Sequence, residues 1–294
     1  MPELVPEPHR PEPGGLDLRQ PEQVSAAELD KFREFYAATK GSMNRSYEFW
    51  LEFRPDVVKR HKARTVQWSY GEKDTTQILS MIHQYAIVGF ADGVDYEIRL
   101  ANKLGALRSD ILDTLSIAFI HAGHPGMYPA GAAAAPLLRD YRAVQADRVR
   151  FPKEWTFDPD AFRSGMDFTG MECTPADLAA LTAWYQEKIG EVPRHVTFLA
   201  KYRPDLLKAY RNRYEHAISE SLPAQMMPYL QLHYNTYRGF DDGIRENLLL
   251  ARAFGMTRTQ VLNAVLSAVL HAGANALDIV DRVGEDLIES FPDT

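Results

Sequence analysis

The chain repeats itself at a spacing of about 150 residues, and this duplication constrains the fold more than any single motif. Residues 83–124 align with 233–274 at a constant offset of 150, and 14 of the 42 positions are identical. The polar residues of the two copies differ far more than the glycines and alanines do. A repeat of this length indicates a domain duplication rather than a solenoid built from units of roughly 20–50 residues.

Composition narrows the class of protein. The 294 residues suffice for two domains of ordinary size. A net charge of -7 without a basic run argues against nucleic-acid binding. No apolar stretch reaches the roughly 18–20 residues of a membrane span, and the N-terminus lacks the basic-then-apolar order of a signal peptide, so we expect a cytoplasmic protein without a membrane partner. The single cysteine, Cys173, excludes an intrachain disulfide and a CxxC redox pair.

Helix signals dominate both copies, and strand alternation is absent, so the sequence predicts an all-α fold. Ser25 and Thr174 each begin a capping box. Apolar helices are predicted over 75–90 and 225–240, followed by shorter helices that end at Gly105 and Gly255. The predicted organisation is a flexible Pro-rich arm (1–24), a first helical domain (25–130), an ordered connector (131–173) and a second helical domain (174–294).

Both copies have a polar residue, an alanine and a glycine at intervals of four, followed by a further helix. Glu97-xxx-Ala101-xxx-Gly105 is followed by a helix that ends at 121–123, and Asn247-xxx-Ala251-xxx-Gly255 repeats the arrangement. This pattern resembles the carboxymuconolactone decarboxylase and alkyl-hydroperoxidase-D-like superfamily. The resemblance implies two tandem helical domains of this family. It also implies a homo-oligomer, a dimer or trimer of tandem chains, because members of the family form rings of helical subunits.

The peroxidase branch of this family uses a CxxCxxxH motif, which this chain lacks. Phe90, Gly93 and Glu97 occupy the three motif positions in the first copy. Disulfide-based peroxide reduction needs two thiols, so the chain is not a thiol peroxidase. The resemblance then implies a cofactor-independent lyase that acts on a small carboxylated or lactone-type metabolite.

Glu97 is the strongest catalytic candidate, because the resemblance directs it toward the family's site. A buried carboxylate can act as a general acid or base near neutral pH. Its counterpart Asn247 cannot exchange a proton, which favours the first copy as the active one. The alternative is an exposed helix glutamate paired with Arg99 or Lys103.

Histidines supply the remaining catalytic candidates. His121 and His271 end apolar helices in both copies, where a helix-capping role and a substrate-binding role are both open. His124 occurs only in the first copy. His83 and His233 lie on apolar helices, as satisfied core residues or as active-site bases.

The predicted site places catalysis on Glu97, His121, His124 and His83. Substrate binding falls to His233, His271 and two tyrosines, Tyr96 and Tyr85, which are replaced by Glu246 and Asn235 in the second copy. No cofactor and no metal are expected. Two alternatives stay open, which are a non-catalytic ligand-binding or scaffold protein and a metal-dependent enzyme that uses His83, Glu97, His121 and His124.

Overall fold

The computed structural model describes residues 14–20, 22–43, 45–68, 74–144, 147–217 and 221–293, and within these ranges all regular structure is helical. The predicted all-α fold is therefore confirmed. In the same ranges, none of the helices combines the length and the apolar character that crossing a bilayer requires.

The helices of the first half set the pattern that the second half repeats. In chain order they are α1 (Ala26–Lys40), α2 (Arg45–Phe53), α3 (Pro55–Trp68), α4 (Thr76–Ile87), α5 (Ala91–Lys103), α6 (Arg108–Ala122) and α7 (His124–Leu138).

The helices of the second half follow at the spacing of the sequence repeat. They are α8 (Pro175–Ile189), α9 (Arg194–Tyr202), α10 (Pro204–Glu215), α11 (Met226–Arg238), α12 (Asp241–Ala253), α13 (Arg258–Ser267), α14 (Val269–Ala272), the 3-10 turn η1 (Ala274–Ala276) and α15 (Leu277–Glu289). The starts of α8, α9 and α10 lie 149 residues after those of α1, α2 and α3, and the starts of α11, α12 and α13 lie 150 residues after those of α4, α5 and α6.

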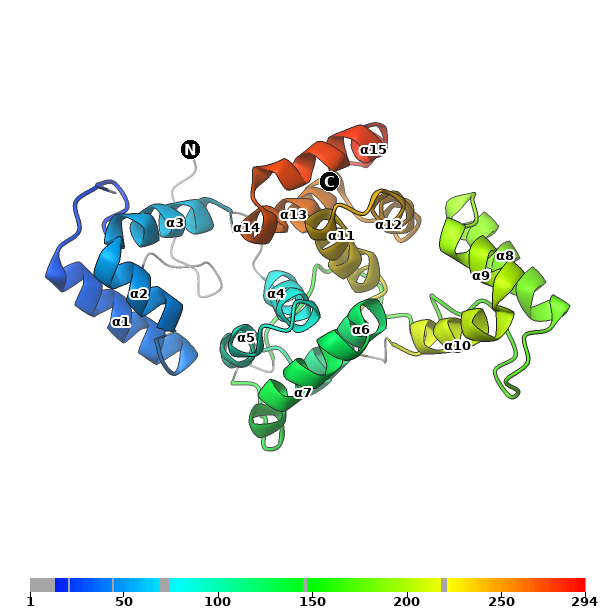
Figure 1. The fold of residues 1–294 in the computed structure, drawn as a ribbon, viewed down its shortest axis with the longest axis horizontal. Helices are drawn as coiled ribbons and strands as arrows, with labels where there is room; N and C mark the ends of the chain where they lie inside the picture. The colour runs from blue at the N-terminus through cyan, green and yellow to red at the C-terminus, as the bar shows by residue number, and fades with distance from the viewer. Residues whose placement is uncertain are drawn as a thin grey trace.

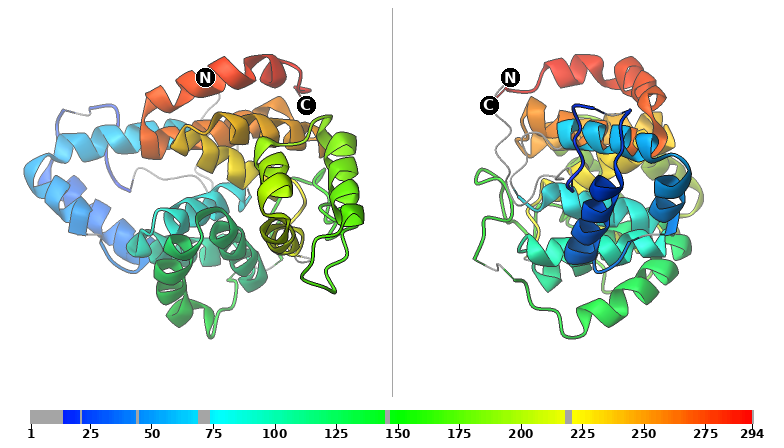
Figure 2. Two further views of the ribbon diagram at one scale, coloured as in Figure 1. Left: turned by 45° about the vertical axis from the view of Figure 1, so that its right-hand side comes forward. Right: turned by 90° about the vertical axis from the view of Figure 1, so that its left-hand side faces the viewer.

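The middle of the molecule is one hydrophobic core to which both halves contribute. Buried residues of α4–α7, of α11–α13 and of α15 belong to a single apolar cluster, which extends into α8–α10, and α4 contacts α11 across the centre. The helices α1–α3 and α8–α10 lie at opposite ends of this core (Figure 1). A turn of 45° keeps α1–α3 at one flank and α8–α10 at the other (Figure 2, left). The first-half trio has an apolar cluster of its own, which includes Phe32, Tyr36 and Val58.

Capping residues explain where the first helix of each half begins and ends. Ser25 and Thr174 accept from the backbone N–H three residues later, and the side chains of Glu28 and Asp177 complete both capping boxes. Gly41 and Gly190 follow in the left-handed conformation, with φ of 84° and 76°. The two helices therefore have matched ends, and the residues just before the glycines occupy equivalent places.

Segments outside the helices are held against the core where they are described. Leu16, within the predicted flexible arm, is buried, while residues 1–13 of that arm lie outside the described part of the chain. In the predicted connector, Trp155 and Phe162 are buried and Phe168 packs against the core, whereas Phe157 is half exposed.

Candidate functional site

Glu97 lies among tyrosines between α1 and α5. Its Oε1 atom is 2.7 Å from the Nζ of Lys40, and the two side chains are 6% and 14% exposed. The same ammonium lies 4.3 Å from the centre of the Tyr96 ring. The charge of Glu97 acts on four tyrosines, so we define the first-repeat site as Lys40, Glu97, Tyr36, Tyr47, Tyr85 and Tyr96.

Lys40 is a partner that the sequence analysis did not predict. Glu97 is buried, so the alternative of an exposed glutamate paired with Arg99 or Lys103 is wrong. Arg99 pairs with Asp95 instead, and Lys103 donates to the carbonyl of Ala38. The sequence contains a signal for this partner, because Lys40 precedes Gly41 in the first copy whereas the apolar Ile189 precedes Gly190 in the second.

The tyrosines of the first-repeat site are neutral hydrogen-bond donors. Burial raises the pKa of Tyr85 and of Tyr96, and the charge of Glu97 adds to the increase for both. Burial also raises the pKa of Tyr36 and Tyr47. The hydroxyls therefore keep their protons at neutral pH, and the charge of the site resides on Lys40 and Glu97.

Each half of the chain contains a pair of histidines in hydrogen-bond contact. The Nε2 of His83 is 3.1 Å from the Nδ1 of His121, and the Nε2 of His233 is 3.1 Å from the Nδ1 of His271. In each pair one ring donates and the other accepts, because neutral imidazole has one nitrogen of each kind. Burial lowers the pKa of His121 to about 3 and that of His271 to about 4, and it lowers the pKa of His83 and His233 as well. The pairs are therefore uncharged at neutral pH.

Ser80 makes the two histidine pairs unequal. Its hydroxyl lies 2.6 Å from the Nδ1 of His233, across the contact between α4 and α11. Leu230 stands at the place equivalent to Ser80, and the Nδ1 of His83 has no partner within the described residues. The second histidine pair is thus fixed by the first half of the chain.

Loss of the Ser80 hydroxyl is expected to destabilise the protein. The Ser80→Ala variant leaves a fully buried His233 nitrogen unpaired, which costs about 1–3 kcal/mol of unfolding free energy. Urea denaturation followed by circular dichroism measures the change. Ser116→Ala removes an exposed helix hydroxyl from α6 and serves as the control, with an expected change within about 0.5 kcal/mol. Equal stability of the two variants would contradict the assigned hydrogen bond.

Tyr85 places the first-repeat site next to the second histidine pair. Its ring centre is 6.0 Å from that of Tyr96 and 5.3 Å from that of His271. Tyr234 of the second half stacks on His121 at 6.2 Å. The structure therefore brings together Glu97, Tyr96, Tyr85, His271 and His233 in one chain of contacts.

His124 lies apart from this chain of contacts. It is the first residue of α7, its side chain is exposed, and its ring centre is 5.5 Å from that of Tyr128. Within the described residues, none of the hydrogen bonds or ring contacts joins His124 to Glu97, His83 or His121. The four predicted catalytic residues are thus not brought to one point.

Glu246, with a side chain that is 13% exposed, is a further carboxyl group of interest that the sequence analysis named only as the counterpart of Tyr96. Its Oε1 atom is 3.5 Å from the hydroxyl of Tyr185, and its Oε2 atom is 3.7 Å from the Nδ1 of His195. Burial raises the pKa of Glu246 to about 7, and the nearby Arg211 guanidinium opposes that increase. Each half therefore has a glutamate with little exposure on equivalent helices, Glu97 on α5 and Glu246 on α12.

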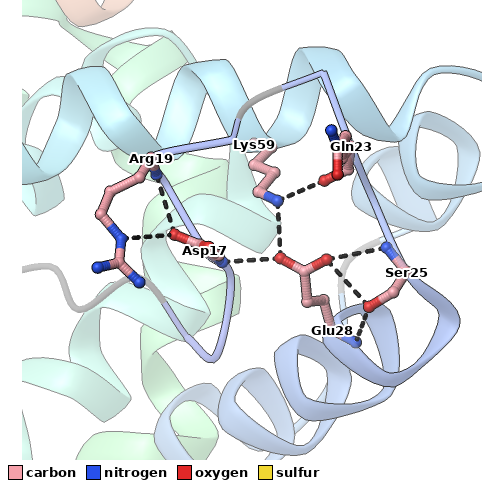
Figure 3. Close-up of polar contacts among 6 residues, drawn as sticks. All are labelled: Asp17, Arg19, Gln23, Ser25, Glu28 and Lys59. Carbon is pink, nitrogen blue, oxygen red and sulfur yellow. Dashed lines mark hydrogen bonds and ion pairs between the residues drawn. The ribbon is translucent and has the colours of Figure 1, made fainter.

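An open pocket beside α1 is a structural feature rather than a ligand site. It is lined by Asp17, Gln20, Gln23, Val24, Ser25, Glu28 and Lys59. Glu28 accepts hydrogen bonds from the backbone N–H groups of Asp17 and Ser25, and Lys59 reaches it at 2.7 Å (Figure 3). These contacts, that of Lys59 foremost, lower the pKa of Glu28 to about 2.

The same network recurs in the second half of the chain. Asp177 accepts from the backbone N–H groups of Asp167 and Thr174, and Lys208 lies 3.0 Å from it. Because both copies retain the network at a helix start, its role is to anchor the preceding segment to the first helix of each half.

No set of three His, Cys, Asp or Glu side chains within the described ranges is placed to hold a metal ion. His83, Glu97, His121 and His124 therefore do not form the metal centre that the metalloenzyme alternative requires. Comparison with known proteins gives no family model, no curated protein and no solved structure that matches the chain.

Proposed function

We propose that the chain is a cofactor-independent lyase that acts on a small carboxylated or lactone-type metabolite at the first-repeat site. The observation that carries the proposal is the Lys40–Glu97 pair, buried among tyrosine hydroxyls. A buried ammonium can bind a substrate carboxylate, and its proton is available to a developing carbanion. The resemblance of the α5–α6 motif to carboxymuconolactone decarboxylases supports the same class of reaction.

The residues of the site suffice for decarboxylation beside a carbonyl group. Breaking the bond to the carboxylate carbon releases CO2 and leaves the electron pair as an enolate. The Tyr96 hydroxyl, which burial keeps protonated, donates to the enolate oxygen. Lys40 transfers a proton to the enolate carbon, and the resulting amine regains a proton from water. Glu97 holds the ammonium in position before the transfer.

Replacement of Glu97 by Gln tests this assignment. Loss of the carboxylate that positions Lys40 is expected to lower kcat by about 10²-fold, the cost of a misplaced catalytic group. The assay is CO2 release from a panel of small keto acids and lactones. Asp95→Asn, an equivalent change on the solvent side of α5 where Asp95 pairs with Arg99, should leave turnover unchanged.

Full turnover by a folded Glu97→Gln protein would contradict the role of the first-repeat site. Turnover that depends on Glu97 but survives in Lys40→Met would place the proton on another group. Absence of CO2 release by the unmodified protein from every member of the panel would contradict decarboxylation.

A non-catalytic ligand-binding protein is the second candidate, and one observation favours it. Glu97 and Lys40 satisfy each other at 2.7 Å, so the first-repeat site is complete without a substrate. Saturable binding of a panel compound without its conversion would support this candidate.

A further inference from the structure

The two halves differ in the residue that the end of the first helix places next to a carboxyl group. In the first half, the last residue of α1, Lys40, places an ammonium against Glu97. In the second half, the last residue of α8 is Ile189, and it cannot supply a charge. Both residues directly precede a left-handed glycine, and α8 packs on α12 as α1 packs on α5. The second half therefore keeps a carboxyl group on α12 and lacks a cation at the end of α8, while the Arg211 guanidinium is linked to Glu246 through the Tyr185 hydroxyl.

We define the second-repeat site as Tyr185, Ile189, His195, Glu246 and Asn247. Tyr185 is the counterpart of Tyr36, Glu246 of Tyr96, and Asn247 of Glu97. Tyr96 and Glu97 both contact the Lys40 ammonium, so adjacent residues of this helix can reach one point. Glu246 and Asn247 are thus expected to face the equivalent point in the second half.

The charged neighbours of Glu246 are already engaged with other groups. Arg211 on α10 bonds to Glu215 at 2.8 Å. At the rim, Arg245 pairs with Glu191 and Arg194 lies near Asp242. His195 on α9 is 3.7 Å from Glu246, and burial lowers its pKa, so it is neutral at pH 7. Glu246 is therefore ionisable and lacks a directly bonded cation among the described residues.

Asn247 adds an acceptor that has no partner. Its side-chain N–H groups are used, since Nδ2 donates to the Gln231 Oε1 at 3.1 Å and to the Gly243 carbonyl at 2.8 Å. Its Oδ1 atom has no hydrogen-bond partner within the described part of the chain, although the residue is 1% exposed. The Oδ1 atom can therefore accept from a further donor, and the Nε2 of its neighbour Gln231 is an unpartnered donor within the same described residues.

Side-chain length indicates the size of the missing group. An isoleucine side chain ends at Cδ1, whereas lysine continues through Cε and Nζ. The fragment present in the first half and absent from the second is therefore a methylene that bears an ammonium.

We infer that the second-repeat site binds the terminal ammonium of a small primary amine, in the place that the Lys40 ammonium occupies in the first half. Glu246 supplies the countercharge, and Asn247 Oδ1 and the Tyr185 hydroxyl supply further acceptors. The inference does not depend on the lyase reaction.

Binding is expected to depend on pH through Glu246. The groups that face it are Tyr185 on α8, His195 on α9, Tyr210, Arg211 and Tyr214 on α10, Glu191 and, on its own helix, Asp242. With a pKa of about 7, the carboxyl group is mostly protonated at pH 6 and mostly ionised at pH 8. A primary ammonium stays charged over this range, so affinity should rise about tenfold from pH 6 to pH 8.

Isothermal titration calorimetry of the full chain with methylammonium chloride tests the inference. At pH 8 one site with a Kd on the order of 1 mM is expected, since one charge-assisted contact provides affinity of that order. Tetramethylammonium chloride, which has no N–H donor, should give no saturable heat. Glu246→Gln should abolish binding, while Glu97→Gln should retain it.

Two exchanges between the halves sharpen the test. Ile189→Lys should place the ammonium of the new lysine next to Glu246 and abolish methylammonium binding. Lys40→Met should expose a second site at Glu97 and raise the stoichiometry from one to two. Circular dichroism identifies any variant that has not folded. No saturable heat with the unmodified protein at 50 times the expected Kd, or binding that survives both Glu246→Gln and Ile189→Lys, would overturn the inference.

Discussion

Replacement of Arg211 by Met is expected to lower the free energy of unfolding by about 3–5 kcal/mol, because it leaves the buried carboxylate of Glu215 without its cation, with only the Ser164 hydroxyl still bonded to it among the described residues. Both side chains are 1% exposed, and their contact is 2.8 Å. The guanidinium also donates to the carbonyl of Phe162 at 2.6 Å and lies 4.3 Å from the centre of the Trp184 ring. Met keeps most of the apolar volume, so the loss reports mainly on the unpaired charge.

Urea denaturation followed by tryptophan fluorescence and circular dichroism measures this loss. Arg213→Met is the matched control, since it removes the same charge from the same helix at an exposed place above the Phe119 ring. The control should change the free energy by about 0.5 kcal/mol or less. A loss below about 1 kcal/mol for Arg211→Met would show that Glu215 finds another partner or a proton.

Local signals predicted the helices well where capping chemistry fixes their ends. The capping boxes at Ser25 and Thr174 are present, and Gly105 and Gly255 adopt φ of 89° and 73°, as a left-handed position after a helix requires. These features depend on residues within one or two turns of each other. Their physical cause is therefore visible in a short window of sequence.

Two local features depart from what the repeat and residue preference suggest. The helical segment that follows Thr257 is divided into α13 and α14 at Ala268, whereas its counterpart α6 is continuous. Aspartate is a preferred N-cap residue, but Phe90 and Phe240 hold the N-cap places of α5 and α12, and Asp92 and Asp242 lie in the first turn. An acidic residue in the first turn is also stabilised by the helix dipole, so residue type alone does not separate an N-cap from a first-turn residue.

Partners across the fold could not be predicted from spacing. Glu97 and Lys40 are 57 residues apart, and Ser80 and His233 are 153 residues apart. Such contacts arise when α1 docks on α5 and when α4 meets α11, which periodicity within one helix does not specify. The repeat does indicate which positions to examine, because the polarity or charge of the side chain differs between the copies at these aligned places. They are Lys40 against Ile189, Ser80 against Leu230 and Tyr96 against Glu246.

Acidification from pH 8 to pH 5 is expected to destabilise the protein through the paired histidines. Burial holds the pKa of His121 at about 3 and that of His271 at about 4, against an ordinary value near 6.5 in the unfolded chain. Below about pH 6.5 the unfolded chain takes up protons that the folded pairs do not, so stability falls as pH drops. At pH 5 each of the two contributes a loss of about 2 kcal/mol, and His83 and His233 act in the same direction.

Glu246 opposes this trend and must be separated from it. Its pKa in the folded protein is about 7, above the ordinary value of 4.5, so the folded state takes up a proton first as pH falls from 7. This contributes about 2–3 kcal/mol of relative stabilisation at pH 5. The Glu246→Gln variant should therefore show a steeper loss of stability between pH 7 and pH 5 than the unmodified protein.

The slope of unfolding free energy against pH distinguishes the two groups. His271→Gln keeps a hydrogen-bonding side chain and removes one titrating ring, so its slope between pH 6.5 and pH 5 should be shallower by up to one proton. The glutamate variant changes the slope in the opposite direction over the same interval. Because the two variants change the slope in opposite directions, one urea-denaturation series at four pH values tests whether burial shifts the pKa of both His271 and Glu246. Identical slopes for the three proteins would show that the histidine pairs are open to water.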